Sequence, residues 1–203
     1  GWWRAAVVLC AAAGPALAAE PSRGALEASA SRVVRDGVVV DFSIGRGEID
    51  RVFNLLHGPG GEDGSLQGAL QLMQIPVTGA DLAASALSMD KVRSKWLWER
   101  NGIDTPPFER FGPDEQDFTR ALDRFGLPLF VKPTGLGSSI GITRVKQAAD
   151  LPAAIALARR YGAWVMVEGE VRGKEYFAGV LERLTLPLIR IETPHEFYDY
   201  AAK

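Results

Sequence analysis

The chain has 203 residues and a mass of 21.9 kDa, which is enough for one large domain or two small ones. Hydrophobic residues make up 47% and charged residues 24%, and these ordinary globular proportions exclude disorder as the main state. The 23 basic and 25 acidic side chains give a net charge of -2, which argues against a dedicated nucleic-acid-binding protein because such proteins need a basic excess. A single cysteine, Cys10, excludes an internal disulfide and a cysteine-rich zinc site, and two histidines leave little for a histidine metal cluster.

The first twenty residues allow two interpretations. Residues 5–19 are almost free of polar groups and end in Ala16-Leu17-Ala18, as a secretory signal does, although the run is too short to span a bilayer. The alternative is a buried strand over 5–10, followed by a loop and a helix over about 26–34. Because the chain starts at Gly1 and stops at Lys203 without a terminating signal, we expect a fragment.

Residues 1–80 are predicted to form a small layered α/β domain. Residues 38–42 and 52–56 are rich in β-forming side chains and predict strands. A glycine loop at 57–61 follows, and residues 75–78 predict a short extended piece. Since strands alternate with a helix, we expect a parallel sheet. The apolar face of that helix is predicted from Leu66, Ala69, Leu70 and Met73.

The rest of the chain predicts helices and strands that alternate less regularly. Ser88 is expected to cap a helix over about 90–101, and a second helix is predicted over 114–125. Asp150 is expected to cap a third, with Pro152 in its first turn. Strands are predicted over residues 127–131, 142–145, 164–168, 175–180 and 184–191.

The most informative segment is the loop from Lys132 to Gly141. Its three glycines and two serines allow the backbone to approach an anion and to direct N–H and O–H donors at it, and Lys132 adds a positive charge. The spacing matches neither a Walker A motif nor GxGxxG. A glycine-rich flap between two strands is typical of loops that fold over ATP phosphates, but it also occurs as a tight hairpin without a ligand.

Four other side chains are candidates, each with a simpler explanation. His57 lies in a glycine loop, where it could touch substrate or only occupy a turn. Lys91 near a helix N-terminus opposes the helix dipole, which favours a ligand role, but it could be a solvated charge like its neighbours Arg93 and Lys95. Glu168 ends one predicted strand and Glu175 begins the next, so both could face one cleft or simply lie on the surface.

Together these segments resemble the D-alanine–D-alanine ligases. Residues 56–68, with His57 and the glycine loop, resemble the family signature, and residues 85–91, 132–141 and 197–203 match further motifs in the same order and spacing. The family belongs to the ATP-grasp superfamily, so the resemblance implies an α/β fold that is α+β in its central part. It implies three regions: an N-terminal parallel-sheet domain over 1–80, a central lid domain over 81–168, and the start of an incomplete C-terminal domain over 169–203.

The resemblance also implies roles on the nucleotide side. Lys91 and Lys132 would contact ATP phosphates, and Ser138 and Ser139 lie in the flap that closes over them. Glu168 lies where the adenine-binding hinge begins, and Glu175 matches the residue that holds the ribose hydroxyls.

On the substrate side, His57 matches the histidine near the carboxylate of the first D-alanine. Ser138 matches a serine that links to the substrate through a hydrogen-bonded triad, and Lys203 matches a mobile-loop lysine that approaches the γ-phosphate. Residues 19–26 are a displaced remnant of a family motif in which Glu20 would bind the substrate's amino group. Ligands for Mg²⁺ or Mn²⁺ are expected beyond Lys203, so we expect this chain alone to be inactive.

The implied reaction is ATP-dependent joining of two D-alanines through an acyl phosphate, for peptidoglycan precursor synthesis. ATP and D-alanine are then the small-molecule partners, with neither nucleic acid nor membrane, a cytoplasmic location, and a homodimer as one option for the oligomeric state. That location favours the strand interpretation of residues 5–10. The alternatives are a related ligase that joins D-alanine to D-lactate or D-serine, an inactive fragment, and an exported binding domain.

Overall fold

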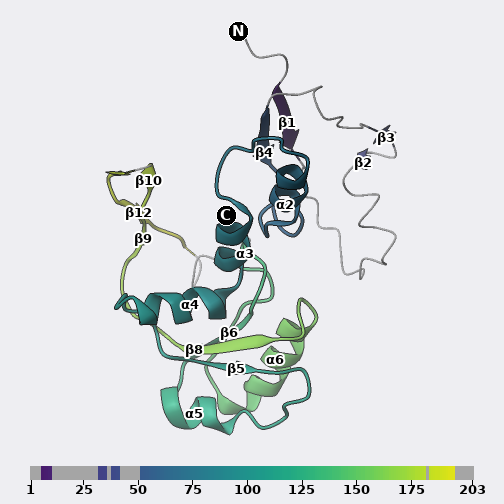
Figure 1. Ribbon diagram of the computed structural model, residues 1–203. Helices are drawn as coiled ribbons and strands as arrows, with labels where there is room; N and C mark the ends of the chain where they lie inside the picture. The colour runs from purple at the N-terminus through teal and green to yellow at the C-terminus, as the bar shows by residue number, and fades with distance from the viewer. Residues whose placement is uncertain (1–5, 11–31, 36–37, 42–50, 182, 195–203) are drawn as a thin grey trace. The chain divides into compact units, whose positions relative to one another are not determined.

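The structure is a computed structural model that describes residues 6–10, 32–35, 38–41, 51–181 and 183–194 (Figure 1). The chain divides into two compact units, residues 1–94 and residues 95–203. Among the described residues, no helix has both the length and the apolar character needed to cross a membrane.

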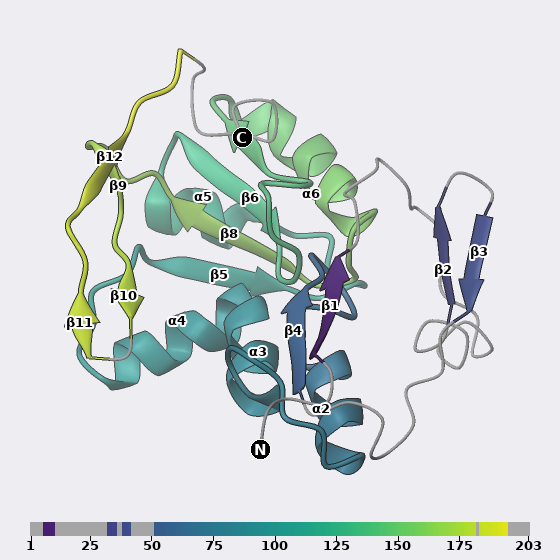
Figure 2. The same cartoon turned by 90° about the horizontal axis from the view of Figure 1, so that it is seen from above.

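The first unit contains a parallel strand pair and an antiparallel strand pair, both visible in Figure 2. Strand β1 (Ala6–Cys10) runs parallel to β4 (Arg51–Leu55), and β2 (Arg32–Arg35) runs antiparallel to β3 (Val38–Asp41). The strands predicted over 38–42 and 52–56 are therefore confirmed for residues 38–41 and 52–55, and residue 42 lies outside the described residues. Residues 6–10 form a strand, and the remainder of the apolar run lies outside the described residues.

The helix predicted over 26–34 is wrong for its last residues, which belong to β2. Val33 and Val34 pair with Val40 and Val39 in the neighbouring strand. Branching at Cβ restricts the side-chain torsion of valine in a helix and favours a pleated strand, so pairing between two valine-rich runs outweighs the helical pattern. Residues 26–31 lie outside the described part of the chain.

Helix α2 (Ser65–Leu72) covers β4 with most of the predicted apolar face. Leu70 is buried with Val52 and Ile75, and Leu66 and Met73 pack against this cluster. Ala69, expected on the same face, is exposed. Residues 75–78 are extended as predicted, and Val77 makes a parallel bridge to Val52.

Two further helices meet at Asp90. Helix α3 (Leu82–Met89) was not predicted from the sequence, and α4 (Lys91–Arg100) begins two residues after it ends. The Asp90 carboxylate accepts hydrogen bonds from the backbone N–H groups of Val92 and Arg93, both at 3.0 Å. Asp90 therefore caps α4, and Ser88, the predicted cap, lies inside α3 and donates its hydroxyl to the Ser85 carbonyl at 3.1 Å.

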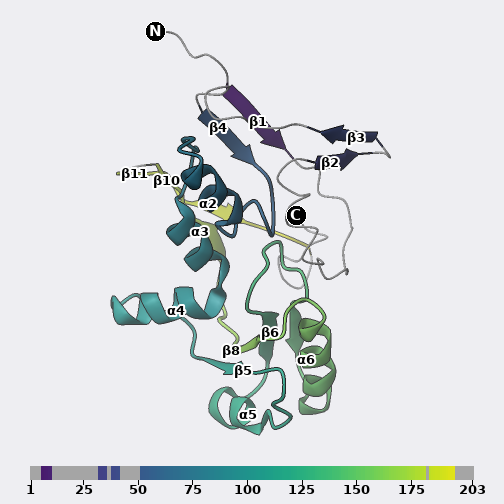
Figure 3. The ribbon, with the colours of Figure 1, turned by 45° about the vertical axis from the view of Figure 1, so that its right-hand side comes forward.

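The second unit contains a four-stranded antiparallel sheet in the order β5-β8-β6-β7. Its core includes Phe111, Leu129, Val131 and Val167, which point to one face of the sheet. Helices α5 and α6 cover that face (Figure 3). The elements are β5 (Phe108–Phe111), α5 (Thr119–Phe125), β6 (Leu129–Pro133), β7 (Thr143–Val145), the 3₁₀ turn η1 (Ala148–Asp150), α6 (Leu151–Arg159) and β8 (Val165–Gly169).

Most strands of this sheet, and helix α6, agree with the prediction. The two differences among them are strand β5 and the role of Asp150 at the start of α6. Strands β6, β7 and β8 fall on the runs predicted over 127–131, 142–145 and 164–168, whereas β5 was not predicted. Helix α6 follows Asp150 and has Pro152 in its first turn, as predicted. The Asp150 side chain makes no capping hydrogen bond, because its backbone already has right-handed helical angles at the end of η1.

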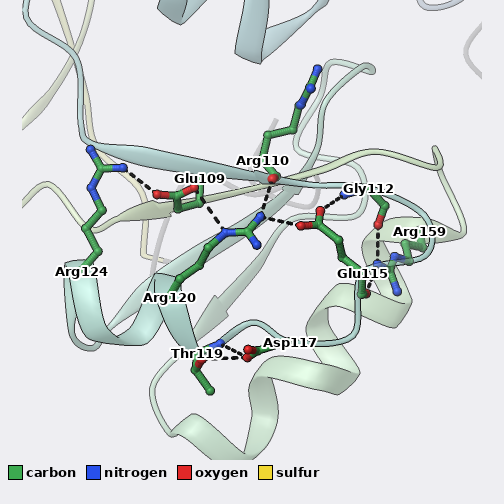
Figure 4. A network of polar contacts seen from close by, with 9 residues as sticks. All are labelled: Glu109, Arg110, Gly112, Glu115, Asp117, Thr119, Arg120, Arg124 and Arg159. Carbon is green, nitrogen blue, oxygen red and sulfur yellow. Dashed lines mark hydrogen bonds and ion pairs between the residues drawn. The ribbon is translucent and has the colours of Figure 1, made fainter.

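Helix α5 is shorter than the predicted helix over 114–125 because side chains hold the segment before Thr119 in another conformation (Figure 4). The Glu115 carboxylate accepts from the Gly112 backbone N–H and pairs with Arg120 at 2.8 Å. Arg159 donates to the carbonyls of Gly112 and Glu115, each at 2.6 Å. In these bonds the backbone groups of the segment have side-chain partners and not the backbone partners that a helix would provide.

Beyond β8 the chain forms two small antiparallel pairs. Strand β9 (Glu175–Phe177) pairs with β12 (Ile189–Ile191), and β10 (Val180–Leu181) pairs with β11 (Leu184–Thr185). The predicted strands over 175–180 and 184–191 are thus each divided in two.

Candidate functional site

The face of the sheet opposite the core carries charged side chains. Successive residues of a strand point to opposite faces, so Lys132 and Glu168 lie on the face that Leu129, Val131 and Val167 do not occupy. Lys132 is opposite Met166 in the register, one step diagonal from Glu168. A lysine and a glutamate in this arrangement are within reach of each other.

A second lysine completes the cluster. The Glu168 carboxylate is bound through Oε1 to Lys132 Nζ, and through Oε2 to Lys95 Nζ at 2.6 Å. The side chains of Lys95 and Glu168 are 4% and 9% exposed, and that of Lys132 is 22% exposed. Two cations therefore share one buried anion, which we call the Lys95–Glu168–Lys132 triplet.

The triplet keeps Glu168 ionised. Burial raises the pKa of this carboxyl, but attraction and hydrogen bonding from Lys132, with a further contribution from Lys95, outweigh burial and lower the pKa below its ordinary value of 4.5. At neutral pH the carboxylate is charged and both of its oxygens have partners, as a buried charge requires.

Lys95 is the residue that sequence reasoning missed. The sequence offers Lys95 only as one of the charges beside Lys91 that could be solvated, but it is buried, and its ammonium group lies 5.1 Å from the centre of the Phe108 ring. The available signal was helical spacing: Lys95 is three residues after Val92, which is also buried. Nothing in the sequence connects Lys95 to Glu168, 73 residues away.

The glycine-rich loop follows Lys132 and joins β6 to β7, as predicted. Three of its non-glycine residues have positive φ: 66° at Leu136, 54° at Ser138 and 58° at Ser139. This conformation is uncommon for side chains with a Cβ and costs conformational energy. Ser138 is exposed and Ser139 half-buried. The loop therefore presents hydroxyl groups on a strained backbone beside a lysine.

The loop that carries His57 belongs to the first unit and is fixed by its own acidic side chains. Glu62 accepts from the Gly58 N–H at 2.5 Å and lies 3.7 Å from the imidazole Nδ1 of His57. Burial raises the pKa of Asp63, but hydrogen bonds from the N–H groups of Gly60 and Ser65 outweigh burial, so this pKa is below its ordinary value. The imidazole itself is 70% exposed and accessible to a ligand.

The remaining predicted residues fall in other elements or outside the description. Lys91 is the first residue of α4 and belongs to the first unit, and Glu175 is exposed at the start of β9. Glu20 and Lys203 lie outside the described residues. Among the described side chains, no three histidine, cysteine or carboxylate groups gather as metal ligands.

Comparison with known families gives the same result in both halves of the chain. A family model described as "D-ala D-ala ligase N-terminus" matches residues 14–80, and one described as "D-ala D-ala ligase C-terminus" matches residues 97–203. The D-alanine–D-alanine ligase of Methylococcus capsulatus is 50% identical over 155 residues, covering 76% of this chain and 50% of that protein. The corresponding ligase of Laribacter hongkongensis is 50% identical over 154 residues, with the same coverage.

Solved structures of such ligases are similar to the described fold. The D-alanine–D-alanine ligase of Bacillus anthracis has a TM-score of 0.67 and 32% identity, covering 77% of this chain and 51% of that one. The VanG D-Ala:D-Ser ligase of Enterococcus faecalis has a TM-score of 0.69 and 38% identity, covering 81% and 49%.

The antiparallel sheet and its glycine-rich loop define a protein of the ATP-grasp class, the fold of these neighbours. More narrowly, the chain belongs to the D-alanine–D-alanine ligase family. It spans about half the length of the curated relatives it matches.

Proposed function

We propose that this chain carries the nucleotide-phosphate and first-substrate parts of an enzyme that joins two D-alanines at the expense of ATP. The observation that carries the proposal is the Lys95–Glu168–Lys132 triplet directly before a strained, serine-containing loop. Fixed cations and backbone N–H groups beside a glycine-rich cover suit a triphosphate, because phosphoryl transfer depends mainly on positioning and charge stabilisation.

The chemistry requires activation of a carboxylate. A carboxylate does not react with an amine at neutral pH because oxide is a poor leaving group. In the proposed reaction one D-alanine carboxylate attacks the γ-phosphoryl group of ATP, which gives an acyl phosphate and ADP. The amine of the second D-alanine then attacks the acyl carbon, and phosphate departs. The dipeptide product is a building block of peptidoglycan. Peptidoglycan forms the cell wall, which maintains the shape of the cell.

On the nucleotide side, Lys132 would contact phosphate and the loop bearing Ser138 and Ser139 would cover it and exclude water. The resemblance adds Lys91 as a second phosphate contact, Glu168 at the start of the adenine hinge and Glu175 at the ribose. Mg²⁺ or Mn²⁺ would neutralise phosphate charge when bound, and we assign it no ligand among the described residues.

On the substrate side, His57 is the candidate whose surroundings the structure describes. Its loop is held by Glu62 and Asp63, and its imidazole is accessible. Glu20, Lys203 and the Ser138-linked triad remain predictions from the resemblance. We propose a cytoplasmic location, where ATP and D-alanine are available. A D-Ala:D-Ser ligase is the second candidate, since VanG is among the similar solved structures.

Binding of a non-hydrolysable ATP analogue tests the phosphate role of Lys132. We expect Lys132→Ala to weaken binding, measured by calorimetry, about tenfold or more, the effect of losing one charge-assisted contact. The matched control is Lys146→Ala, because Lys146 follows β7 of the same sheet but is exposed. Equal affinities for the unaltered chain, Lys132→Ala and Lys146→Ala would contradict the proposal. D-alanine-dependent release of phosphate from ATP then tests the reaction.

A further inference from the structure

The triplet carries one more positive charge than negative charge. Lys95 and Lys132 share the single carboxylate of Glu168, which lies between them. Within the described part of the chain, none of the three takes part in another ion pair. A partly buried surplus cation is costly unless an anion compensates it, so the triplet is electrostatically prepared for an anionic ligand.

The two lysines are not equivalent. Lys95 is 4% exposed, held at 2.6 Å from Glu168 Oε2, and lies against the Phe108 ring. Lys132 is 22% exposed and lies near the end of β6, just before the glycine-rich loop. Lys132 is therefore the lysine with access to a ligand, and Lys95 is the one that stays with the carboxylate.

The different exposure of the two lysines affects the cost of a contact between Lys132 and a ligand. If Lys132 were the only partner of Glu168, a contact with phosphate would compete with a buried carboxylate that had no other cation. Breaking a buried pair in that way is strongly unfavourable because an uncompensated charge remains. With Lys95 in place, the carboxylate keeps one charged partner throughout.

We propose that Lys95 is a positioning residue that neutralises Glu168 and thereby leaves Lys132 available to bind anionic phosphate. The inference rests on the proposed function, since it assumes that Lys132 meets the phosphates of a nucleotide. Lys95 itself touches no ligand in this proposal. Its effect on binding passes entirely through the charge of Glu168.

A double-mutant cycle between positions 95 and 168 separates this electrostatic role from a packing role. The variants are Lys95→Met, which keeps an unbranched side chain without the charge, Glu168→Gln, which removes the anion, and their combination. The measurement is the calorimetric affinity for the same ATP analogue, with circular dichroism to check folding. Each comparison is made between variants that share the same residue at position 168, so any direct contact of that residue with the nucleotide cancels.

With Glu168 present, we expect Lys95→Met to weaken binding about tenfold, because Lys132 becomes the only partner of the carboxylate. In the Glu168→Gln background, where the anion is absent, Lys95→Met should change binding by less than about threefold. Equal losses in both backgrounds would overturn the proposal and assign Lys95 a packing role. So would an unchanged affinity of Lys95→Met itself.

The affinities of the unaltered chain and of Lys132→Ala distinguish a failure of this inference from a failure of the proposed function. If the unaltered chain does not bind the analogue, or if Lys132→Ala binds as well as the unaltered chain, the proposed phosphate site is wrong. If both behave as proposed and only the cycle fails, the inference about Lys95 alone is wrong. Should Lys95→Met not fold, Glu168→Gln is compared with the double variant, and a loss of binding above about threefold between those two overturns the inference.

Discussion

At Glu168, burial and neighbouring charge act in opposite directions on one carboxyl group. Burial favours the protonated form, whereas Lys132 and Lys95 favour the ionised form, and the lowered pKa shows that the lysines prevail. A buried pair of this kind contributes little net stability compared with apolar packing, but loss of one member is costly because the partner charge stays buried. The stability of the second unit should therefore be sensitive to this single side chain.

We predict that Glu168→Ala lowers the free energy of unfolding by about 3 kcal/mol, because it leaves buried Lys95 without its anion. Urea denaturation followed by circular dichroism measures the loss. The matched control is Glu192→Ala, since Glu192 pairs with Arg190 but its side chain is 71% exposed. That change should cost about 1 kcal/mol or less, and similar losses at both positions would refute the buried-charge argument.

At the scale of the element, the loop between β6 and β7 combines strained and unstrained positions. Ser138 and Ser139 adopt positive φ in succession, and Gly141 has φ of 69° near the end of the loop. A Cβ built at Gly141 would lie 2.6 Å from the Tyr161 ring and 2.9 Å from Pro133 Cγ, whereas a Cβ at Gly135 would meet nothing within 4 Å. Of these two glycines, only Gly141 is required by close packing and backbone conformation.

Gly141→Ala should consequently destabilise the chain by about 2 kcal/mol, through both the positive φ and the overlap with Pro133. Gly135→Ala provides the control in the same loop and should change the free energy of unfolding by less than about 0.5 kcal/mol. Thermal unfolding of the two variants under identical conditions tests the difference. If Gly141→Ala is as stable as Gly135→Ala, the described conformation of the loop end is wrong.

For the whole molecule, carboxylates with a lowered pKa occur in both units. Asp63 lies in the first unit, and Glu115, Asp117, Glu168 and Glu170 lie in the second. Each binds its proton less readily in the folded chain than in the unfolded chain. Their contribution to stability is fully present above the unfolded pKa and disappears as the pH falls through the folded pKa.

Unfolding in urea should accordingly show a constant midpoint from about pH 7 to pH 5 and a falling midpoint below the ordinary glutamate value of 4.5. In Glu168→Gln the urea midpoint should fall less steeply with decreasing pH, because that variant has no carboxylate at position 168 to take up a proton. High salt should weaken the exposed pairs more than the triplet. A midpoint that stays constant, or rises, between about pH 5 and pH 3 would contradict the lowered pKa values.

Most of the elements could be predicted because hydrophobic period and turn residues are local properties. Strands at 38–42 and 52–56, the helix after the His57 loop and the hairpin beginning at Lys132 all follow from such patterns. These local patterns failed where side-chain hydrogen bonds compete with them, from neighbouring residues or from residues distant in the chain. Helix α4 is capped by Asp90 and not by Ser88 as predicted. Helix α5 begins at Thr119 and not at residue 114, because Glu115 and Arg159 hold the preceding segment.

The amino-acid sequence by itself determined the family and the order of its motifs, because both reside in the identity and spacing of residues along the chain. It also identified Lys132 and Glu168 as candidates, each from its place at the end of a strand. Only the tertiary structure joined these two residues and added Lys95 from α4. Burial and ion pairing depend on which strands and helices are neighbours, and that information is absent from any single segment of the chain.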